Sequence, residues 1–105
     1  MLLSFLFLKV EGIDEDYSNI HPILPPKKRL KVGTFKVINN GFRLGERFLK
    51  IIFDNALKNK VDEIYVTIFD KREEQCRLIS LLEQWGFVFW GMKGEERVYV
   101  RDFHP

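Results

Sequence analysis

The stretch NNGFRLGERFL, residues 39–49, joins a β-like segment to a helix-like one and contains two glycines, Gly41 and Gly45. Glycine lets a ligand approach the backbone closely, and a helix N-terminus offers free N–H groups and the positive end of a dipole. The pattern therefore predicts a phosphate-binding turn, to which Arg43 adds a charge-assisted contact. A second interpretation stays open, in which Gly41 forms a tight turn and Gly45 packs against another element.

This stretch matches neither of two common phosphate motifs. A Walker loop would carry Lys followed by Ser or Thr, and a dinucleotide fingerprint would contain Gly-x-Gly. Neither pattern is found in residues 39–49. The elements on either side of residues 39–49 must therefore be considered before a function is assigned to the stretch.

The apolar pattern around the stretch predicts one α/β domain with a mixed sheet and two packed helices. Alternation and β-branched residues indicate the strands, and apolar residues at helical spacing indicate the helices. The predicted order is β-loop-β-α-β-α-β-β. The strands are expected at 2–10, 29–38, 61–69, 87–92 and 97–103, and the helices at 44–60 and 73–85.

Several features refine this layout. Gly33, inside the strand at 29–38, predicts a bulge or a close backbone approach. The nearly continuous β-forming run at 61–69 is typical of a central strand covered on both faces. Three prolines between residues 12 and 28 exclude a regular helix there, and Gly86 is placed to end the second helix.

The periodicity also predicts which side chains face inward. In the last strand, Val98 and Val100 alternate with Arg97, Tyr99 and Arg101. In the first helix, the side that faces the core is expected to carry Leu44, Phe48, Ile51, Ile52, Asn55 and Ala56.

Length and charge limit the classes of function. The chain has 105 residues, enough for a single core, and its formal net charge of +2 is nearly balanced. A surface dedicated to duplex binding usually has a stronger basic bias. The basic stretch PPKKRLK, residues 25–31, is interpreted as a solvated loop, so nucleic acid is not expected as a partner.

Cysteine and histidine usage points to a cytoplasmic protein without a metal site. Cys76 is the only cysteine, which excludes an intrachain disulfide and fits a reducing compartment. It is expected to be buried or half-buried. His21 and His104 lie far apart in the sequence, so no metal site is expected. The apolar N-terminal run MLLSFLFLKV is too short for a membrane helix and lacks signal-peptide features, so no membrane partner is expected.

From about residue 29 to residue 103 the chain resembles the second half of the GNAT superfamily of N-acetyltransferases. In that family a strand leads into a phosphate turn, a helix and a central strand, followed by a helix ending in Gly-Phe and a final hairpin. The matching segments here are NGFRLG for the turn, LGERFLKIIFDNALKNKVDEIYVTIF for the helix and central strand, and LISLLEQWGF for the second helix.

The resemblance implies a single acyl-CoA-binding domain over residues 1–105 that uses acetyl-CoA as co-substrate and an unidentified amine as acceptor. The pantetheine arm would run along residues 35–38, where the strand separates from the central strand, with the acetyl group near Val37 and Ile38. The cofactor-binding residues implied in this way are Phe35, Val37, Ile38, Gly41, Phe42, Arg43, Leu44, Gly45 and Gln75, the last at the position of a family Asn.

The chain also departs from the family pattern. Arg43 takes the place of the first glycine of the turn, and Leu82 takes the place of a helical Tyr that many members use as general acid. The strand at 29–38 carries no Glu or Asp that could act as general base, so the catalytic residues stay unknown.

The region before the turn-bearing strand is short for the family, and this leaves alternatives open. The chain could be a trimmed enzyme, a non-catalytic CoA-binding or interaction module, or a domain completed by a partner chain. A small nucleic-acid binder is a less favoured alternative. The aromatic-rich C-terminal hairpin could also form a homodimer interface.

Overall fold

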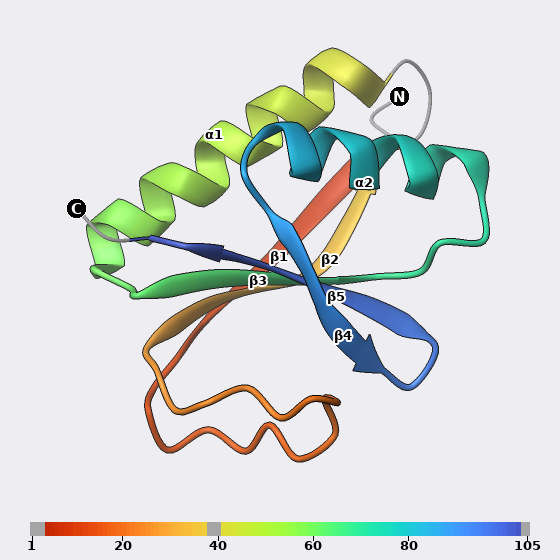
Figure 1. Ribbon diagram of the computed structural model, residues 1–105. Coiled ribbons are helices and arrows are strands. Elements are labelled where there is room, and N and C mark those ends of the chain that lie inside the picture. Colours follow the sequence, from red (N-terminus) through yellow and green to blue (C-terminus); the bar gives the residue numbers. More distant parts are fainter. Residues whose placement is uncertain (1–3, 38–40, 104–105) are drawn as a thin grey trace.

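The computed structural model describes residues 4–37 and 41–103, and the side chains of residues 7–33 and 45–103. The predicted order β-loop-β-α-β-α-β-β is confirmed (Figure 1). The elements are β1 (Ser4–Glu11), β2 (Arg29–Val37), α1 (Gly41–Asn59), β3 (Glu63–Ile68), α2 (Glu73–Gln84), β4 (Val88–Lys93) and β5 (Glu96–Asp102).

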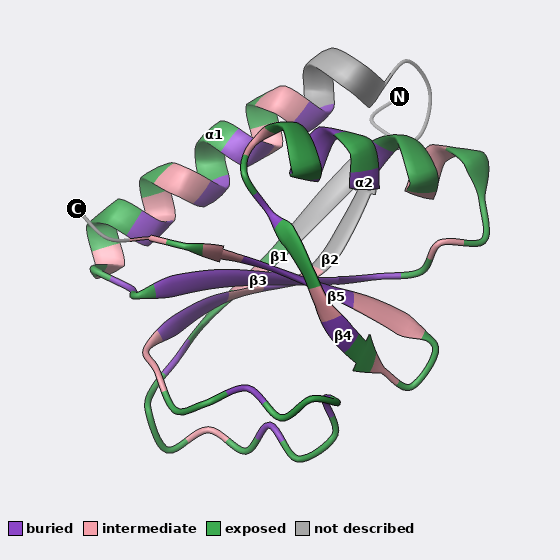
Figure 2. Ribbon diagram, in the orientation of Figure 1, coloured by how far each residue is buried: buried purple, intermediate pink, exposed green. Residues whose placement is uncertain are grey.

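The five strands form one mixed sheet in the order β1-β2-β3-β5-β4. Only β2 and β3 are parallel, and the other neighbouring pairs are antiparallel. All six residues of β3 are buried, as expected for a central strand (Figure 2). Helices α1 and α2 cover one face of the sheet, and the loop of residues 12–28 lies on the other (Figure 1).

The helix side of the sheet carries the larger apolar core. Leu49, Ile52 and Ala56 of α1 are fully buried there. The predicted inward face of α1 was therefore partly wrong, because Leu49 was missed and Ile51 is 44% exposed. The apolar residues of α1 spread over more of the helix surface than the part that contacts the sheet. Periodicity alone therefore did not show which of them point into the core.

The loop side carries a second, smaller core. Tyr17, Ile20 and Leu24 of the loop pack against Tyr65 of β3 and against the valines of β5, Val98 and Val100. Residues 12–28 thus form no helix, as the prolines predicted, but they serve as a packed layer. This layer was not predicted, because irregular segments have no periodicity to show their buried positions.

The loop is fastened to the outer strand β4. His21 and Met92 exchange two backbone hydrogen bonds of 2.8 and 2.9 Å, and Trp90 Nε1 donates to the Pro22 carbonyl at 2.6 Å. A Cβ on Gly91 would lie 2.2 Å from the His21 carbonyl oxygen, so only glycine allows this close approach.

Two local predictions have clear outcomes, and β5 shows a further detail. Gly86 has φ 89° and ends α2 as predicted, with the Phe87 N–H donating to the Leu82 carbonyl at 3.0 Å. Tyr99, which alternates with Val98 and Val100 along β5, is 1% exposed and belongs to the helix-side core, so β5 buries side chains on both faces. Cys76 is exposed instead of buried, because it lies on the solvent side of α2.

Candidate functional site

Strands β2 and β3 lie side by side only over their first halves. Their register runs from Arg29 opposite Glu63 to Val32 opposite Val66. Beyond this point β2 continues to Val37 and β3 to Ile68 with no further pairing between them. The two strand ends therefore present facing main-chain groups that are not bonded to each other, and the separation implied by the family resemblance is present.

A bulge marks the point where the strands part. In the β1–β2 register Phe7 lies opposite Thr34 and Leu8 opposite Val32, which leaves Gly33 without a partner. The predicted bulge at Gly33 is thus confirmed. A Cβ at this position would lie 2.9 Å from Phe7 Cδ1, which explains the glycine. Because bulges bend the strand that carries them, Gly33 fits a turning of β2 away from β3.

Helix α1 begins at Gly41, three residues before the predicted start. Both glycines of the opening stretch therefore lie within the helix and not in a turn before it. The first N–H groups of a helix have no acceptor inside the helix, and the first turn of α1 contains no acidic residue. The positive end of a helix thus follows the unpaired half of β2 along the chain.

Gly45 has a packing role. A Cβ at this position would lie 2.7 Å from Leu81 Cδ2 and 3.7 Å from Leu78 Cδ2 of α2. The absence of a side chain lets the two helices approach closely, and this contact offsets the usual cost of glycine inside a helix. The packing interpretation left open by the sequence therefore holds for Gly45.

The predicted cofactor-binding residues fall on three elements. Phe35 and Val37 lie in the unpaired half of β2, and residues 41–45, which include Phe42, Arg43 and Leu44, begin α1. Ile38 lies outside the described residues. Gln75 lies at the start of α2, where its Oε1 accepts from the N–H groups of Lys71 and Arg72 at 3.1 and 2.9 Å. A contact of any of these residues with a cofactor stays a prediction.

Leu82 is fully buried in the helix-side core. It therefore has a structural role in the core, whereas the family resemblance implied a general-acid Tyr near this position. The described residues contain no group of three or more His, Cys, Asp or Glu that could hold a metal ion.

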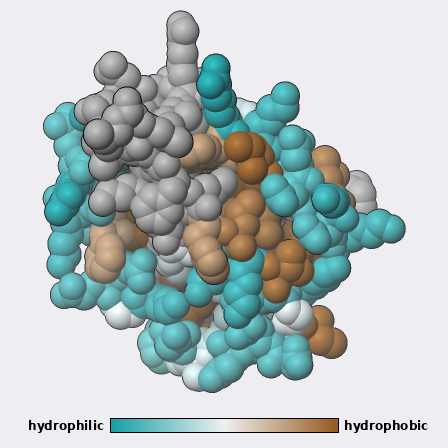
Figure 3. All heavy atoms as spheres, turned by 180° about the vertical axis from the view of Figure 1, so that it is seen from behind, coloured by the Kyte–Doolittle hydropathy of each residue, from teal (hydrophilic) through white to brown (hydrophobic). Residues whose placement is uncertain are grey.

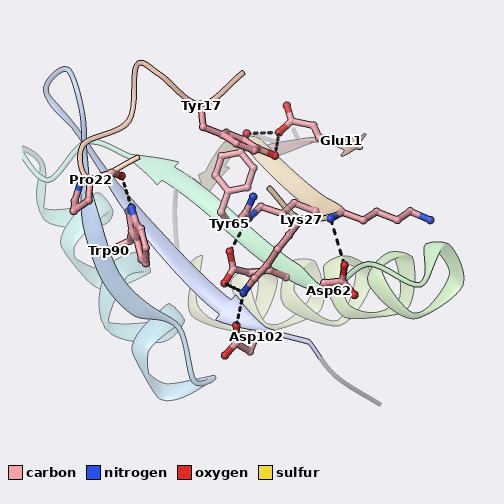
Figure 4. A network of polar contacts seen from close by, with 11 residues as sticks. Glu11, Tyr17, Pro22, Lys27, Asp62, Tyr65, Trp90 and Asp102 are labelled. Carbon is pink, nitrogen blue, oxygen red and sulfur yellow. Dashed lines mark hydrogen bonds and ion pairs between the residues drawn. The ribbon is translucent and has the colours of Figure 1, made fainter. Parts of the chain in front are cut away.

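A polar network that the sequence did not reveal lies beneath the loop (Figure 4). Glu11 is 3% exposed, and its Oε1 accepts from the hydroxyls of Tyr17 at 3.1 Å and Tyr65 at 2.5 Å. Arg29 is fully buried, donates from Nε to Glu63 Oε1 at 2.6 Å, and lies 4.9 Å from the Tyr17 ring centroid. The network joins β1, β2, β3 and the loop.

Burial within this network changes the acidity of both tyrosines. It raises the pKa of Tyr17 to about 12, with the Glu11 carboxylate acting in the same direction and Arg29 opposing it. The pKa of Tyr65 is raised further, again first by burial and then by its hydrogen bond to Glu11. Both phenols therefore stay protonated at neutral pH and act as donors.

The same contacts change the interpretation of the basic stretch at 25–31. Arg29 is buried, so the expectation of a solvated loop was wrong for this residue. Lys27 lies 3.6 Å from Glu63 and 3.8 Å from Asp102. Carboxylates of the chain itself thus pair with part of the positive charge that a nucleic acid would need.

Exposed apolar side chains occur at both edges of the sheet. A hydrophobic area interrupts the polar surface on the back of the molecule (Figure 3). Phe7 and Val10 of β1 are 52% and 41% exposed, and Val88 and Phe89 of β4 are 61% and 51% exposed. A homodimer interface on the C-terminal hairpin stays a prediction. No helix in the described part of the chain is long and apolar enough to cross a membrane.

Two solved structures resemble this fold. One is an acetyltransferase of the GNAT family from Listeria monocytogenes, with a TM-score of 0.64, 16% identity, and coverage of 91% of this chain and 56% of that one. The other is the NatC complex bound to Gag peptide and CoA, with a TM-score of 0.65, 14% identity, and coverage of 97% and 62%.

These comparisons show a GNAT-like fold. The chain spans less than two thirds of the length of either matched structure. No family model matches the sequence, and no curated protein does so either.

Proposed function

We propose that the chain binds acetyl-CoA between β2 and β3 and transfers the acetyl group to an amine, as GNAT-type N-acetyltransferases do. The observation that carries this proposal is that the two parallel strands β2 and β3 stop pairing after Val32 and Val66, and that α1 follows β2 with no acidic residue in its first turn. The fold supports it, because one similar structure is an acetyltransferase of the GNAT family and the other is a complex bound to CoA.

The diphosphate of the cofactor would lie at the start of α1. Backbone N–H groups of Gly41, Phe42 and Leu44 supply donors there, and the helix dipole favours an anion. Arg43, in the same turn, adds a positive charge. Gly45 contributes mainly by letting α1 pack against α2, which fixes the direction of this helix end.

The pantetheine arm would lie beside the second half of β2, where β3 no longer pairs with it. From the start of α1 it would run back along β2, from Val37 toward Gly33, and its amides would bond with main-chain groups that β3 does not use. Four residue steps of an extended strand span about 13 Å, a length suited to such an arm. The thioester would then lie toward Gly33, the inner end of the separation. This replaces the position near Val37 and Ile38 expected from the resemblance, because the diphosphate at the start of α1 takes that end.

For this reaction the chain has to position the amine beside the thioester and polarise the thioester carbonyl. Acetyl-CoA supplies an activated acyl group when bound. Main-chain N–H groups beside the thioester carbonyl stabilise the charge that develops on its oxygen, and holding the amine next to it lowers the entropic cost of reaction. Leu82 cannot donate a proton, so no side chain is assigned as general acid.

Calorimetric titration with acetyl-CoA, CoA and inorganic phosphate tests the proposal. Arg43→Glu reverses a charge at the proposed diphosphate site, yet an acidic residue in the first helical turn favours the helix itself. The matched control, Lys50→Glu, makes the same change at an exposed position farther along α1. Arg43→Glu should weaken binding of both CoA species at least about tenfold, since hydrogen bonds to charged groups contribute about 1.5–3 kcal/mol.

Lys50→Glu should leave the affinity unchanged. Equal affinities in both variants, or no saturable binding to the unmodified chain, would contradict the proposal. Gly45→Glu is unsuitable as a test, because its side chain would collide with Leu81.

A second candidate is a CoA-binding module without transferase activity. The burial of Leu82 favours it, because no proton donor replaces the family Tyr at this position. Release of free thiol from acetyl-CoA in the presence of a panel of amines separates the two candidates. Binding without thiol release above the rate in buffer would support the module and contradict the transferase.

A further inference from the structure

Lys31 lies beside the inner end of the separation between β2 and β3. Its neighbours on β2, Leu30 and Val32, belong to the helix-side core, and side chains alternate along a strand. The Lys31 side chain therefore extends on the loop side of the sheet. Its Cε lies 3.6 Å from the position that a Cβ on Gly33 would take, so the side chain runs along the strand toward the bulge.

The amine of Lys31 is not neutralised by a carboxylate. Among the described residues Lys31 takes part in no ion pair, although it is half-buried. Glu11, a carboxylate whose charge acts on Lys31, already accepts from two tyrosines and lies 3.8 Å from Lys9. In this respect Lys31 differs from Lys9 and Lys27, which lie within 4 Å of carboxylates.

The surroundings of Lys31 make its neutral, nucleophilic form easier to reach than in an exposed lysine. Burial lowers the pKa of Lys31 below its ordinary value, and the neighbouring Lys93 of β4 lowers it again. Lys9 acts in the same direction, while Glu11 opposes them. A larger fraction of Lys31 is therefore an unprotonated amine near neutral pH than is the case for an exposed lysine.

We propose that Lys31 is an acyl acceptor, and that the chain acetylates itself at this position from acetyl-CoA held between β2 and β3. The inference rests on the proposed function. The lone pair of the neutral Lys31 Nζ forms a bond with the acetyl carbonyl carbon, and the carbon–sulfur bond breaks. The sulfur leaves with the bonding electrons and takes up the proton that nitrogen loses, so that the products are acetyl-Lys31 and the free thiol of CoA.

The modification would change the charge of the site. Acetylation removes the positive charge of a lysine, and here it would end the repulsion between Lys31 and Lys93. The acetylated side chain would occupy the loop side of the separation, next to the place where another amine would have to approach the thioester. Self-acetylation would thus compete with transfer to external amines.

Peptide mapping by mass spectrometry after incubation with acetyl-CoA tests the inference. Acetylation of Lys31 should be at least about tenfold faster than that of Lys50, because a positioned group reacts at a high effective concentration. Lys31→Arg should abolish the fast addition of one acetyl group, while Lys50→Arg should retain it. In the Arg43→Glu variant, acetylation of Lys31 should slow to the rate at which Lys50 is acetylated.

Two controls separate this inference from the proposed function. Competitive labelling with acetic anhydride without CoA should show Lys31 titrating at lower pH than Lys50, and equal titration would overturn the inference. Calorimetric binding of acetyl-CoA without faster acetylation of Lys31 would overturn the inference alone, and so would fast acetylation that persists in Arg43→Glu. Absence of binding would overturn both proposals.

Discussion

The two faces of the sheet are held in different ways. On the helix side, α1 and α2 bury a continuous apolar core that includes Leu49, Ile52 and Leu82, all fully buried. On the loop side, a few apolar contacts accompany buried charges, of which the pair Arg29–Glu63 at 2.6 Å is the shortest. The packing on the helix side is stabilised mainly by the apolar area removed from water. The packing on the loop side depends more on particular pairs of charged and polar side chains.

The difference bears on the candidate site. Arg29 and Glu63 are also backbone partners at the start of the β2–β3 register. Their side chains therefore tie together the half of the two strands that stays paired, while the other half separates after Val32. We infer that the helix side supplies most of the stability and that the loop side fixes the point at which the strands part.

The largest expected effect comes from breaking the loop-side ion pair. Glu63→Ala leaves the Arg29 guanidinium buried without its carboxylate, which should lower the free energy of unfolding by about 3–5 kcal/mol. The double variant Arg29→Met with Glu63→Leu should recover most of this loss, because a buried pair replaced by apolar groups is close to neutral. Urea unfolding measures both. A loss below about 1 kcal/mol in Glu63→Ala, typical of an exposed pair, would contradict the comparison.

A helix-side cavity should have a somewhat smaller effect. Leu82→Ala removes buried methyl groups from the apolar core and should cost about 3 kcal/mol by urea unfolding. Because no charge is involved, the loss should be the same at low and at high salt. A loss that varies strongly with salt would indicate that the helix side also depends on electrostatic partners.

The smallest effect is the response of the loop side to alkaline pH. The pKa of Tyr17 is raised from 10.0 to about 12 in the folded chain, so the folded state holds this proton more tightly than the unfolded state. The resulting stability is complete below pH 10 and is lost as the pH rises through 12. Tyr65 acts in the same direction.

Chemical unfolding at a series of pH values, together with tyrosinate absorbance, follows this response. Tyr17→Phe should unfold with a flatter pH dependence above pH 10 than the unmodified chain. The same slope in both proteins would show that Tyr17 ionises as it does in the unfolded chain.

The sequence predicted the helix side better than the loop side, for a physical reason. Regular elements repeat their buried positions, so the order of elements, the burial of β3 and the end of α2 at Gly86 could be found from periodicity. Residues 12–28 have no repeat, and the burial of Tyr17 and Ile20 depends on contacts with distant strands. The burial of Arg29 likewise depends on Glu63, which is distant in the sequence.

At the candidate site, the sequence located the glycines but not their geometry. The bulge at Gly33 was predicted, since glycine inside a strand usually marks such a defect. The start of α1 was placed too late, because glycine disfavours helix interiors and the contact of Gly45 with Leu81 was not visible in the sequence. Lys31 was not singled out either, because the groups that act on it lie on two other strands, β1 and β4, distant in the sequence.

The most direct test of the central claim is an NMR titration of the isotope-labelled chain with CoA, following the backbone amides. The account predicts that the large shift changes occur at residues 33–37, 41–44 and 67–68, the groups on either side of the separation and at the start of α1. The amides of residues 12–28, on the loop, should change little. Shift changes centred on that loop, or none at residues 33–37 and 41–44 at saturating CoA, would contradict the account.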